Sequence, residues 1–315
     1  MAIEGAPWLG PHKRQTAPVA ESRRRSRRTT TSRSTHPTRS FCVALLPLAA
    51  FLLLALLGPL LIPASPVDQH LSQRLLPPIS LTGSNTAWDH ALGTDGLGRD
   101  LAARIAVAAR LSLLIGIAAT AASAIIGVAL GLVAGGLGGI GDRVVTTLAD
   151  VQLAIPFVVV AIAVTATLGQ SVGNVLIVLI VTGWVTFARV VRMQAGVVRT
   201  STYVQAAVAL GASPNRVLLR HVLPNVLAPI IVLTSQHIAA VMLYEASLTY
   251  LGVGLPADRV TLGGIIADGQ DLLFVAWWVS ALPGLAIVLA VFGFNLLGDV
   301  VQVGVRGAWR RKSSR

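Results

Sequence analysis

The sequence has few charged residues. Asp, Glu, Lys and Arg make up 12% of its 315 residues, whereas soluble domains average about 25%. Hydrophobic residues make up 54%, and the mean hydropathy is +0.73. This composition excludes an ordinary soluble domain and predicts an integral membrane protein.

Lysine is nearly absent, with Lys13 and Lys312 the only two. The net charge of +12 is therefore carried by arginine, which is concentrated near the two ends and in one internal segment. A phosphate-binding loop needs a Gly-Lys pair, and neither lysine follows a glycine. We therefore expect that the chain does not power itself with ATP and that it binds no cofactor.

Cysteine occurs once, as Cys42, which excludes an internal disulfide and a multi-cysteine metal site. The sequence also lacks His-Glu-x-x-His. These absences disfavour an intramembrane enzyme, so we expect neither a catalytic nor a metal site.

Six apolar runs, free of charge except for Glu245 in the fifth, could cross a bilayer core of about 30 Å as helices. They are residues 41–62, 111–133, 153–168, 172–188, 230–251 and 276–297. The third run is short, and Pro156 should bend it or begin it. We therefore predict an all-α polytopic membrane protein with six transmembrane helices.

The positions of arginine and lysine predict its sidedness. If the N-terminus is cytoplasmic, twenty of the 25 basic residues fall on the cytoplasmic side. The other five are Arg74, Arg99, Arg104, Arg110 and Arg259. Both termini should therefore be cytoplasmic, and residues 63–110 should form an extracytoplasmic loop.

The two ends of the chain read as basic tails. Residues 1–40 are rich in Arg, Ser, Thr and Pro and poor in large apolar residues, so we expect a disordered cytoplasmic tail. A nucleic-acid-binding arm is less favoured, because a membrane-embedded body follows at once. An organelle transit peptide has a similar composition and is a second, less favoured alternative. Residues 303–315 should form a second basic cytoplasmic tail.

The longest inner loop contains "YVQAAVALGASPNRVLLRHVLPN". Ser201 or Thr202 can cap a helix over residues 203–210, which Gly211 can end in the left-handed conformation. The pattern then predicts a tight turn before a second helix.

That second helix has its own start and stop signals. Ser213 can cap it, with Pro214 at its first position, and Pro224 should stop it before the next span. So short an amphipathic hairpin is not stable alone in water, so it must lie on the membrane surface or in the groove of a partner protein. The small residues of "QAAVAL" favour the protein groove.

Glu245 is the only acidic residue well inside a predicted span. A lone carboxylate in hydrocarbon is costly, so it should face the interior of the bundle or water. A role on a transport pathway and a structural hydrogen bond to a neighbouring helix both remain open. His237, on the same helix, is expected to serve packing or hydrogen bonding rather than to contact substrate.

The segment "GTDGLGRD", Gly93 to Asp100, suggests a turn that feeds a short helix on the outer face. Asp100 and Arg104 are four residues apart, a spacing that predicts an ion pair on one helix face. Trp277 and Trp278 lie at the outer end of the last span and are typical of an interfacial belt.

Three stretches resemble the permease subunits of ATP-binding-cassette importers, in the dipeptide, oligopeptide and nickel branch. The cytoplasmic signature of that family matches Gln205, Ala206, Ala207, Gly211, Ser213, Pro214, His221, Leu223 and Pro224. "HALGTDGLGRD" is similar to a segment of the second permease subunit, in which Gly93, Thr94, Asp95, Gly98, Arg99 and Asp100 carry the match. The third stretch is "EASLTYLGVGLP", from Glu245 to Pro256. Gln205 departs from the widest form of the signature, which has Glu.

The resemblance implies a type I importer permease fold over residues 111–302. It also implies that the loop 189–228 couples the permease to a nucleotide-binding subunit. Glu245 is the candidate for a pathway or gate residue, on the ground of its place inside a span. The implied partners are a homologous permease, two ATP-binding subunits that use ATP and Mg, an extracytoplasmic solute-binding protein and membrane lipid, without nucleic acid. The expected location is the bacterial inner membrane.

The resemblance places di- and oligopeptides first among the possible cargoes, ahead of nickel complexes and other small solutes. The main alternative is an ion-coupled secondary transporter. Such a protein should show broken helices and several intramembrane ionisable groups, and Glu245 alone is weak support for it.

Overall fold

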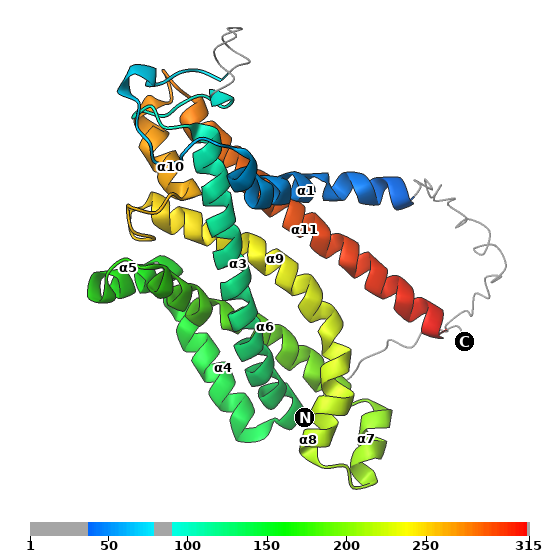
Figure 1. Ribbon diagram of the computed structural model, residues 1–315. Helices are drawn as coiled ribbons and strands as arrows, with labels where there is room; N and C mark the ends of the chain where they lie inside the picture. Colours follow the sequence, from blue (N-terminus) through cyan, green and yellow to red (C-terminus); the bar gives the residue numbers. More distant parts are fainter. Residues whose placement is uncertain (1–36, 79–89, 314–315) are drawn as a thin grey trace, which may run out of the picture.

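The structure is a computed structural model that describes residues 37–78 and 90–313 (Figure 1). The predicted tail over residues 1–40 therefore lies almost entirely outside the described residues. The α-helices are α1 Pro37–Leu61, α3 Leu101–Leu132, α4 Gly139–Ala154, α5 Phe157–Leu168, α6 Val172–Arg199, α7 Thr202–Ala209, α8 Pro214–Val217, α9 Leu223–Tyr250, α10 Leu262–Gly269 and α11 Trp278–Ser313. Short 3-10 turns are η1 Leu71–Gln73 and η5 Gln270–Leu272, and π turns are η3 Val133–Leu137 and η4 Leu218–Val222.

The helices confirm an all-helical, multi-pass membrane protein. Among the described residues, four helical stretches are long and apolar enough to cross a membrane: Leu101–Leu137, Val172–Arg199, Pro214–Tyr250 and Trp278–Gly304. A fifth span results if α4 and α5, which meet at an angle of 82°, count together. The apolar stretch Leu45–Leu61 of α1 is shorter. The count of six stays a prediction.

Pro156 interrupts the helix between α4 and α5, as the sequence predicted. Ile155 has extended backbone angles (φ −98°, ψ 120°), and α5 begins directly after the proline. Proline disfavours a helical conformation in the residue before it and has no N–H to donate. Helix α4 itself was missed, because Asp142 and Asp150 interrupt its apolar pattern.

Helices α3 and α6 extend beyond the apolar runs that predicted them. Helix α3 begins at Leu101, and α6 continues to Arg199. Hydropathy marks only the part of a helix that is rich in apolar residues, whereas helical hydrogen bonding continues until a cap ends it. At the start of α3, the Asp100 side chain accepts a hydrogen bond from the Ala103 N–H at 2.7 Å.

The α3–α6 pair forms the centre of the bundle through close backbone contact. A Cβ atom on Gly131 would lie 2.7 Å from the carbonyl oxygen of Ala188, and Gly127 and Gly135 face the α6 backbone in the same way. In lipid, no hydrophobic driving force brings helices together. Van der Waals contact in such close packing therefore supplies much of the attraction between them.

The bundle has two contrasting ends (Figure 1). Helices α7 and α8 lie at one of them, which we call the hairpin end. The connecting segments 62–78 and 90–100 gather with α10 at the opposite end, which we call the loop end. Helix α11 packs along α9 and also against α1 and α10. The bundle therefore holds the two predicted motifs far apart.

Candidate functional site

The hairpin end contains the predicted helix, tight turn and helix. Gly211 has a φ of +86°, in the left-handed region that glycine adopts at low cost. Ser201 and Ser213 occupy the predicted N-cap positions, but neither side chain accepts a capping hydrogen bond. The Ser201 hydroxyl instead donates to the carbonyl of Val198 at 2.5 Å.

The prediction that Pro224 stops the second helix is wrong. The chain is helical from Pro214 to Tyr250, and Pro224 lies in the first turn of α9. The π turn η4 immediately precedes α9, and its wider winding accommodates a residue that cannot donate a backbone hydrogen bond. The second arm of the hairpin is therefore continuous with a membrane helix.

One side of the hairpin packs on the bundle. The buried residues Val204, Val217, Leu218 and Val222 form a cluster with side chains of α3 and α6, such as Leu132 and Val191. At the base, Asn225 Nδ2 donates to the Tyr203 hydroxyl at 3.1 Å and to the His221 carbonyl at 2.6 Å. These contacts hold the hairpin against the end of the bundle.

The other side of the hairpin is exposed and partly apolar. Leu210, at the tip, is 89% exposed, and Val208 and Tyr203 are each at least half exposed. Of the signature residues, the exposed ones are Gln205, Ala206, Gly211, Ser213, Pro214 and Pro224, whereas Ala207, His221 and Leu223 are half-buried. Gln205 Nε2 donates to the Thr200 carbonyl at 3.3 Å. The signature residues thus border a surface that no other described part of the chain covers.

The loop end is organised around Asp95, which is 1% exposed. Its Oδ1 accepts from the backbone N–H groups of Leu97 and Arg99 at 2.9 and 3.0 Å. Its Oδ2 accepts from Arg99 Nε at 2.6 Å and from Arg104 Nη1 at 2.5 Å. Four donors on one carboxylate fix the segment Gly93 to Asp100, which we call the outer-loop motif, in a single conformation.

The predicted ion pair between Asp100 and Arg104 is wrong. Asp100 caps α3, and its other oxygen lies 2.8 Å from His90 Nδ1. Arg104 reaches Asp95 and, through Nη2, Asp268 of α10 at 3.2 Å. Spacing of four residues allows a helical pair, but a capping position and a distant carboxylate compete for the same two side chains.

The other residues of the motif close the turn. Gly93 and Gly98 both have positive φ angles, of 80° and 75°. The Thr94 hydroxyl donates to the Gln73 carbonyl at 2.5 Å, and Trp278 Nε1 donates to the Thr94 carbonyl at 3.3 Å. Trp278 is thus buried in the protein, contrary to the predicted interfacial belt, whereas its neighbour Trp277 is about half exposed.

Asp268 links the motif to α10 and was not predicted from the sequence. Its Oδ2 accepts from Arg99 Nη2 at 3.1 Å as well as from Arg104. Burial raises the pKa of the Asp268 carboxyl above its usual value, the charge of Asp95 acts in the same direction, and Arg99 opposes both.

Glu245 lies inside the bundle, as expected, and is fully buried. Ser112 of α3 donates to its Oε2 at 2.7 Å, and Thr249 donates to its Oε1 at 3.2 Å. The bond from Ser112 confirms the expected structural hydrogen bond between Glu245 and a neighbouring helix. The role of Glu245 on a pathway stays a prediction.

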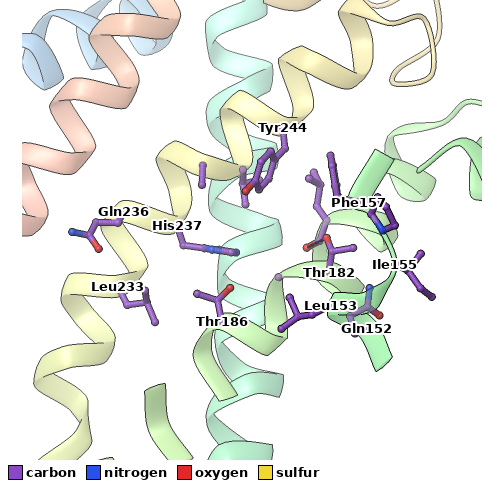
Figure 2. Close-up of a pocket in the computed structure, with 15 residues that line it drawn as sticks. Gln152, Leu153, Ile155, Phe157, Thr182, Thr186, Leu233, Gln236, His237 and Tyr244 are labelled. Carbon is purple, nitrogen blue, oxygen red and sulfur yellow. Dashed lines mark hydrogen bonds between the residues drawn. The ribbon is translucent and has the colours of Figure 1, made fainter. Parts of the chain in front are cut away.

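A cavity of about 460 Å³, which we call the central cavity, lies between the α4–α5 break, α6 and α9 (Figure 2). Its wall is mainly apolar, and its polar lining residues are Gln152, Thr182, Thr186, Gln236 and His237. His237 is 8% exposed, and its Nε2 has no hydrogen-bond partner among the described residues. Glu245 does not line this cavity. A mostly apolar space with a few polar groups suits a small amphiphilic molecule.

The fold, the exposed hairpin and the central cavity define a class: an all-helical, multi-pass membrane protein with a cavity among its spans. The chain belongs to the family of binding-protein-dependent transport system inner membrane components, which matches residues 127–311. The protein is therefore a permease component of the inner membrane, and the resemblance seen in the sequence is confirmed.

Three relatives are informative. The chain is 37% identical over 251 residues to a probable D,D-dipeptide transport system permease protein of Escherichia coli, covering 80% of this chain and 82% of that protein. It is 36% identical over 257 residues to a dipeptide transport system permease protein of Alkalihalophilus pseudofirmus, covering 82% of each. It is 36% identical over 211 residues to an oligopeptide transport system permease protein of Bacillus subtilis, covering 67% of this chain and 69% of that protein.

Proposed function

We propose that the chain is one of two homologous permease subunits in an ATP-binding-cassette importer of di- and oligopeptides. An extracytoplasmic solute-binding protein delivers the peptide, and two separate ATP-binding subunits supply the energy. The names of the relatives, which cover most of this chain at 36–37% identity, support peptides over nickel complexes as cargo.

The hairpin carries this proposal. Leu210 and Val208 expose apolar surface beyond the end of the bundle, where contact with water is unfavourable by about 25 cal/mol per Å². A protein cleft that covers these side chains removes that cost. In our proposal this cleft belongs to an ATP-binding subunit, which binds the ATP and Mg that this chain does not.

The continuity of the hairpin with α9 supports mechanical coupling. A displacement of α8 acts on a helix that runs without interruption from Pro214 to Tyr250. Along that helix, Leu233, His237 and Tyr244 line the central cavity (Figure 2). Closure of the ATP-binding subunits would therefore move one wall of the cavity relative to α6, as a shear between packed helices.

The proposed topology has six spans, namely α1, α3, the α4–α5 pair, α6, α9 and α11. The alternation of these spans puts the hairpin end and both termini in the cytoplasm. Twenty of the 25 basic residues then lie on that side, in agreement with the positive-inside rule.

Reconstituted transport tests the proposal. The chain is co-purified with its partner permease, ATP-binding subunits and binding protein, and uptake of labelled alanyl-alanine into proteoliposomes is measured. We expect uptake that requires Mg-ATP and the binding protein. Uptake by the chain alone, driven by a proton or sodium gradient, would establish the secondary transporter instead.

A further inference from the structure

A second cavity, of about 420 Å³, lies at the loop end. It is bounded by α10, by the segment that follows α9 and by the outer-loop motif. Its volume is within the range of small-molecule sites, about 300–1,000 Å³. It lies apart from the central cavity, with which it shares no lining residue.

Basic side chains outnumber acidic ones in the described wall of this cavity. Arg99, Arg104 and Arg259 line it, and Asp268 is the only acidic residue among the described residues of the lining, while Asp95 pairs with Arg99 and Arg104 from behind the wall. Guanidinium groups bind carboxylates through paired, charge-assisted hydrogen bonds, which are stronger than neutral ones. The wall therefore favours a ligand that carries a carboxylate.

Two of the three arginines are held in place before any ligand arrives. Asp95, buried beneath them, binds Arg99 at 2.6 Å and Arg104 at 2.5 Å. The side chain of Arg104 is only 6% exposed, and its Nε–H is buried with no acceptor among the described residues. A fixed guanidinium loses little conformational freedom when a ligand binds, which increases affinity.

Arg259 is the arginine that is free to bind. Its side chain is 60% exposed, and among the described residues its nearest carboxylate is that of the 75% exposed Asp258, 3.9 Å away. An exposed pair at that distance contributes little energy. A ligand carboxylate can therefore recruit Arg259 at small cost.

Asp268 narrows the class of ligand. Its side chain is 52% exposed on the cavity wall. A carboxylate at this position disfavours an anion that lacks N–H groups, because it repels the negative charge, and it accepts hydrogen bonds from an ammonium or amide N–H. A small molecule with both a carboxylate and N–H groups meets both requirements.

We propose that this cavity is an entry site that binds the C-terminal carboxylate of a short peptide. The binding groups are the guanidinium of Arg259 and that of Arg99, which Asp95 holds in place. The inference rests on the proposed function, since it assigns the peptide a first contact on this subunit. It adds a binding site to the loop end, where the peptide arrives before it reaches the central cavity.

Thiol protection tests the site directly. Ala257 lines the cavity and is exposed, so Ala257→Cys in a Cys42→Ser background provides one reactive thiol at the site. The assembled transporter in nanodiscs is labelled with a maleimide, with increasing alanyl-alanine or alanyl-alaninamide. We expect alanyl-alanine to slow labelling. Alanyl-alaninamide should need an about tenfold higher concentration for the same slowing, because the amide lacks the charged carboxylate.

Two further variants separate the cavity from general charge effects. Arg259→Gln should raise the concentration of alanyl-alanine for half protection about tenfold. Arg74→Gln should leave it unchanged, because Arg74 is exposed at the same end and does not line the cavity.

Equal protection by acid and amide, no protection by either, or an unchanged concentration for Arg259→Gln would overturn the site. Uptake of alanyl-alanine by the same preparation separates the two proposals. Uptake without protection refutes the entry site alone, whereas absence of uptake under Mg-ATP refutes the proposed function.

Discussion

The two ends of the molecule use their polar and apolar residues in opposite ways. At the loop end, Asp95 is buried and accepts four hydrogen bonds from its own chain. At the hairpin end, Leu210 is an apolar side chain that is 89% exposed. The loop end satisfies the Asp95 carboxylate within the chain, although apolar side chains such as Leu71 are exposed there too. At the hairpin end, the exposed apolar side chain stands at the tip of the predicted coupling motif.

This difference indicates how the Asp95 network and the hairpin tip should each respond to substitution. Buried charges with full hydrogen bonding fix a conformation, so the loop end can hold a preformed site. An exposed apolar tip gains free energy only when a partner covers it. Substitutions in the Asp95 network should therefore act mainly on stability, and substitutions on the outer side of the hairpin mainly on assembly.

The largest expected effect on stability is at Asp95. Asp95→Asn removes the carboxylate that pairs with Arg99 and Arg104 and leaves a buried guanidinium without it. We expect a loss of about 3–5 kcal/mol in the free energy of unfolding, as for other broken buried ion pairs. Thermal unfolding of the purified chain in detergent measures this loss.

Asp258→Asn is the matched control for Asp95. Asp258 is at the same end but is 75% exposed, and its distance to Arg259 is 3.9 Å. Its substitution should change the stability by less than about 0.5 kcal/mol. Equal losses for both variants would contradict the view that internal bonding of Asp95 fixes the loop end.

A smaller effect is expected at Gly211. Gly211→Ala costs about 1–2 kcal/mol, because an L-residue is strained at a φ of +86°. The new methyl group meets nothing within 4 Å, so the cost comes from the backbone alone. Hydrogen exchange of the hairpin amides measures the loosening.

Gly196→Ala is the control for the hairpin turn. Gly196 lies in α6, has no positive φ, and its added methyl group also meets nothing within 4 Å. There alanine should be neutral or stabilising by up to about 1 kcal/mol. If the two variants behave alike, the left-handed turn is not what shapes the hairpin.

The smallest expected effect concerns pH at Asp268. Because burial raises the pKa of this carboxyl, the folded protein holds the proton more tightly than the unfolded chain does. The free energy of unfolding of the wild type should therefore fall as the pH rises above about 4. Asp268→Asn cannot titrate at this position and should not show that fall. Solvent screening of the half-exposed group limits the change to a few tenths of a kcal/mol. Melting curves at pH 4 to 7 would contradict this if the wild type gained stability over the variant with rising pH.

Local chemistry in the sequence predicted the hairpin turn and the break at Pro156. Glycine and proline restrict the backbone at their own positions, so Gly211 and Pro156 could be interpreted without the rest of the fold. Pro224 misled for the same reason, because a π turn that compensates for a proline leaves no clear mark in the sequence.

Long-range partners could not be predicted. Arg104 and Asp268 are 164 residues apart, and only the packing of α10 against α3 brings them together. The central cavity was missed likewise, since Gln152, Thr182 and His237 come from three helices. Glu245, the predicted pathway residue, is distinctive in sequence but lies outside that cavity.

Co-purification of the ATP-binding subunits with hairpin variants tests the central claim most directly. Leu210→Asp places a charge on the exposed tip, and Leu71→Asp makes the same change at the loop end, where Leu71 is 70% exposed. We predict that Leu210→Asp lowers the recovered ATP-binding subunits at least about tenfold, the equivalent of about 1.4 kcal/mol, with an unchanged melting temperature of the chain. Leu71→Asp should retain them. Full recovery of the subunits with Leu210→Asp would contradict the account.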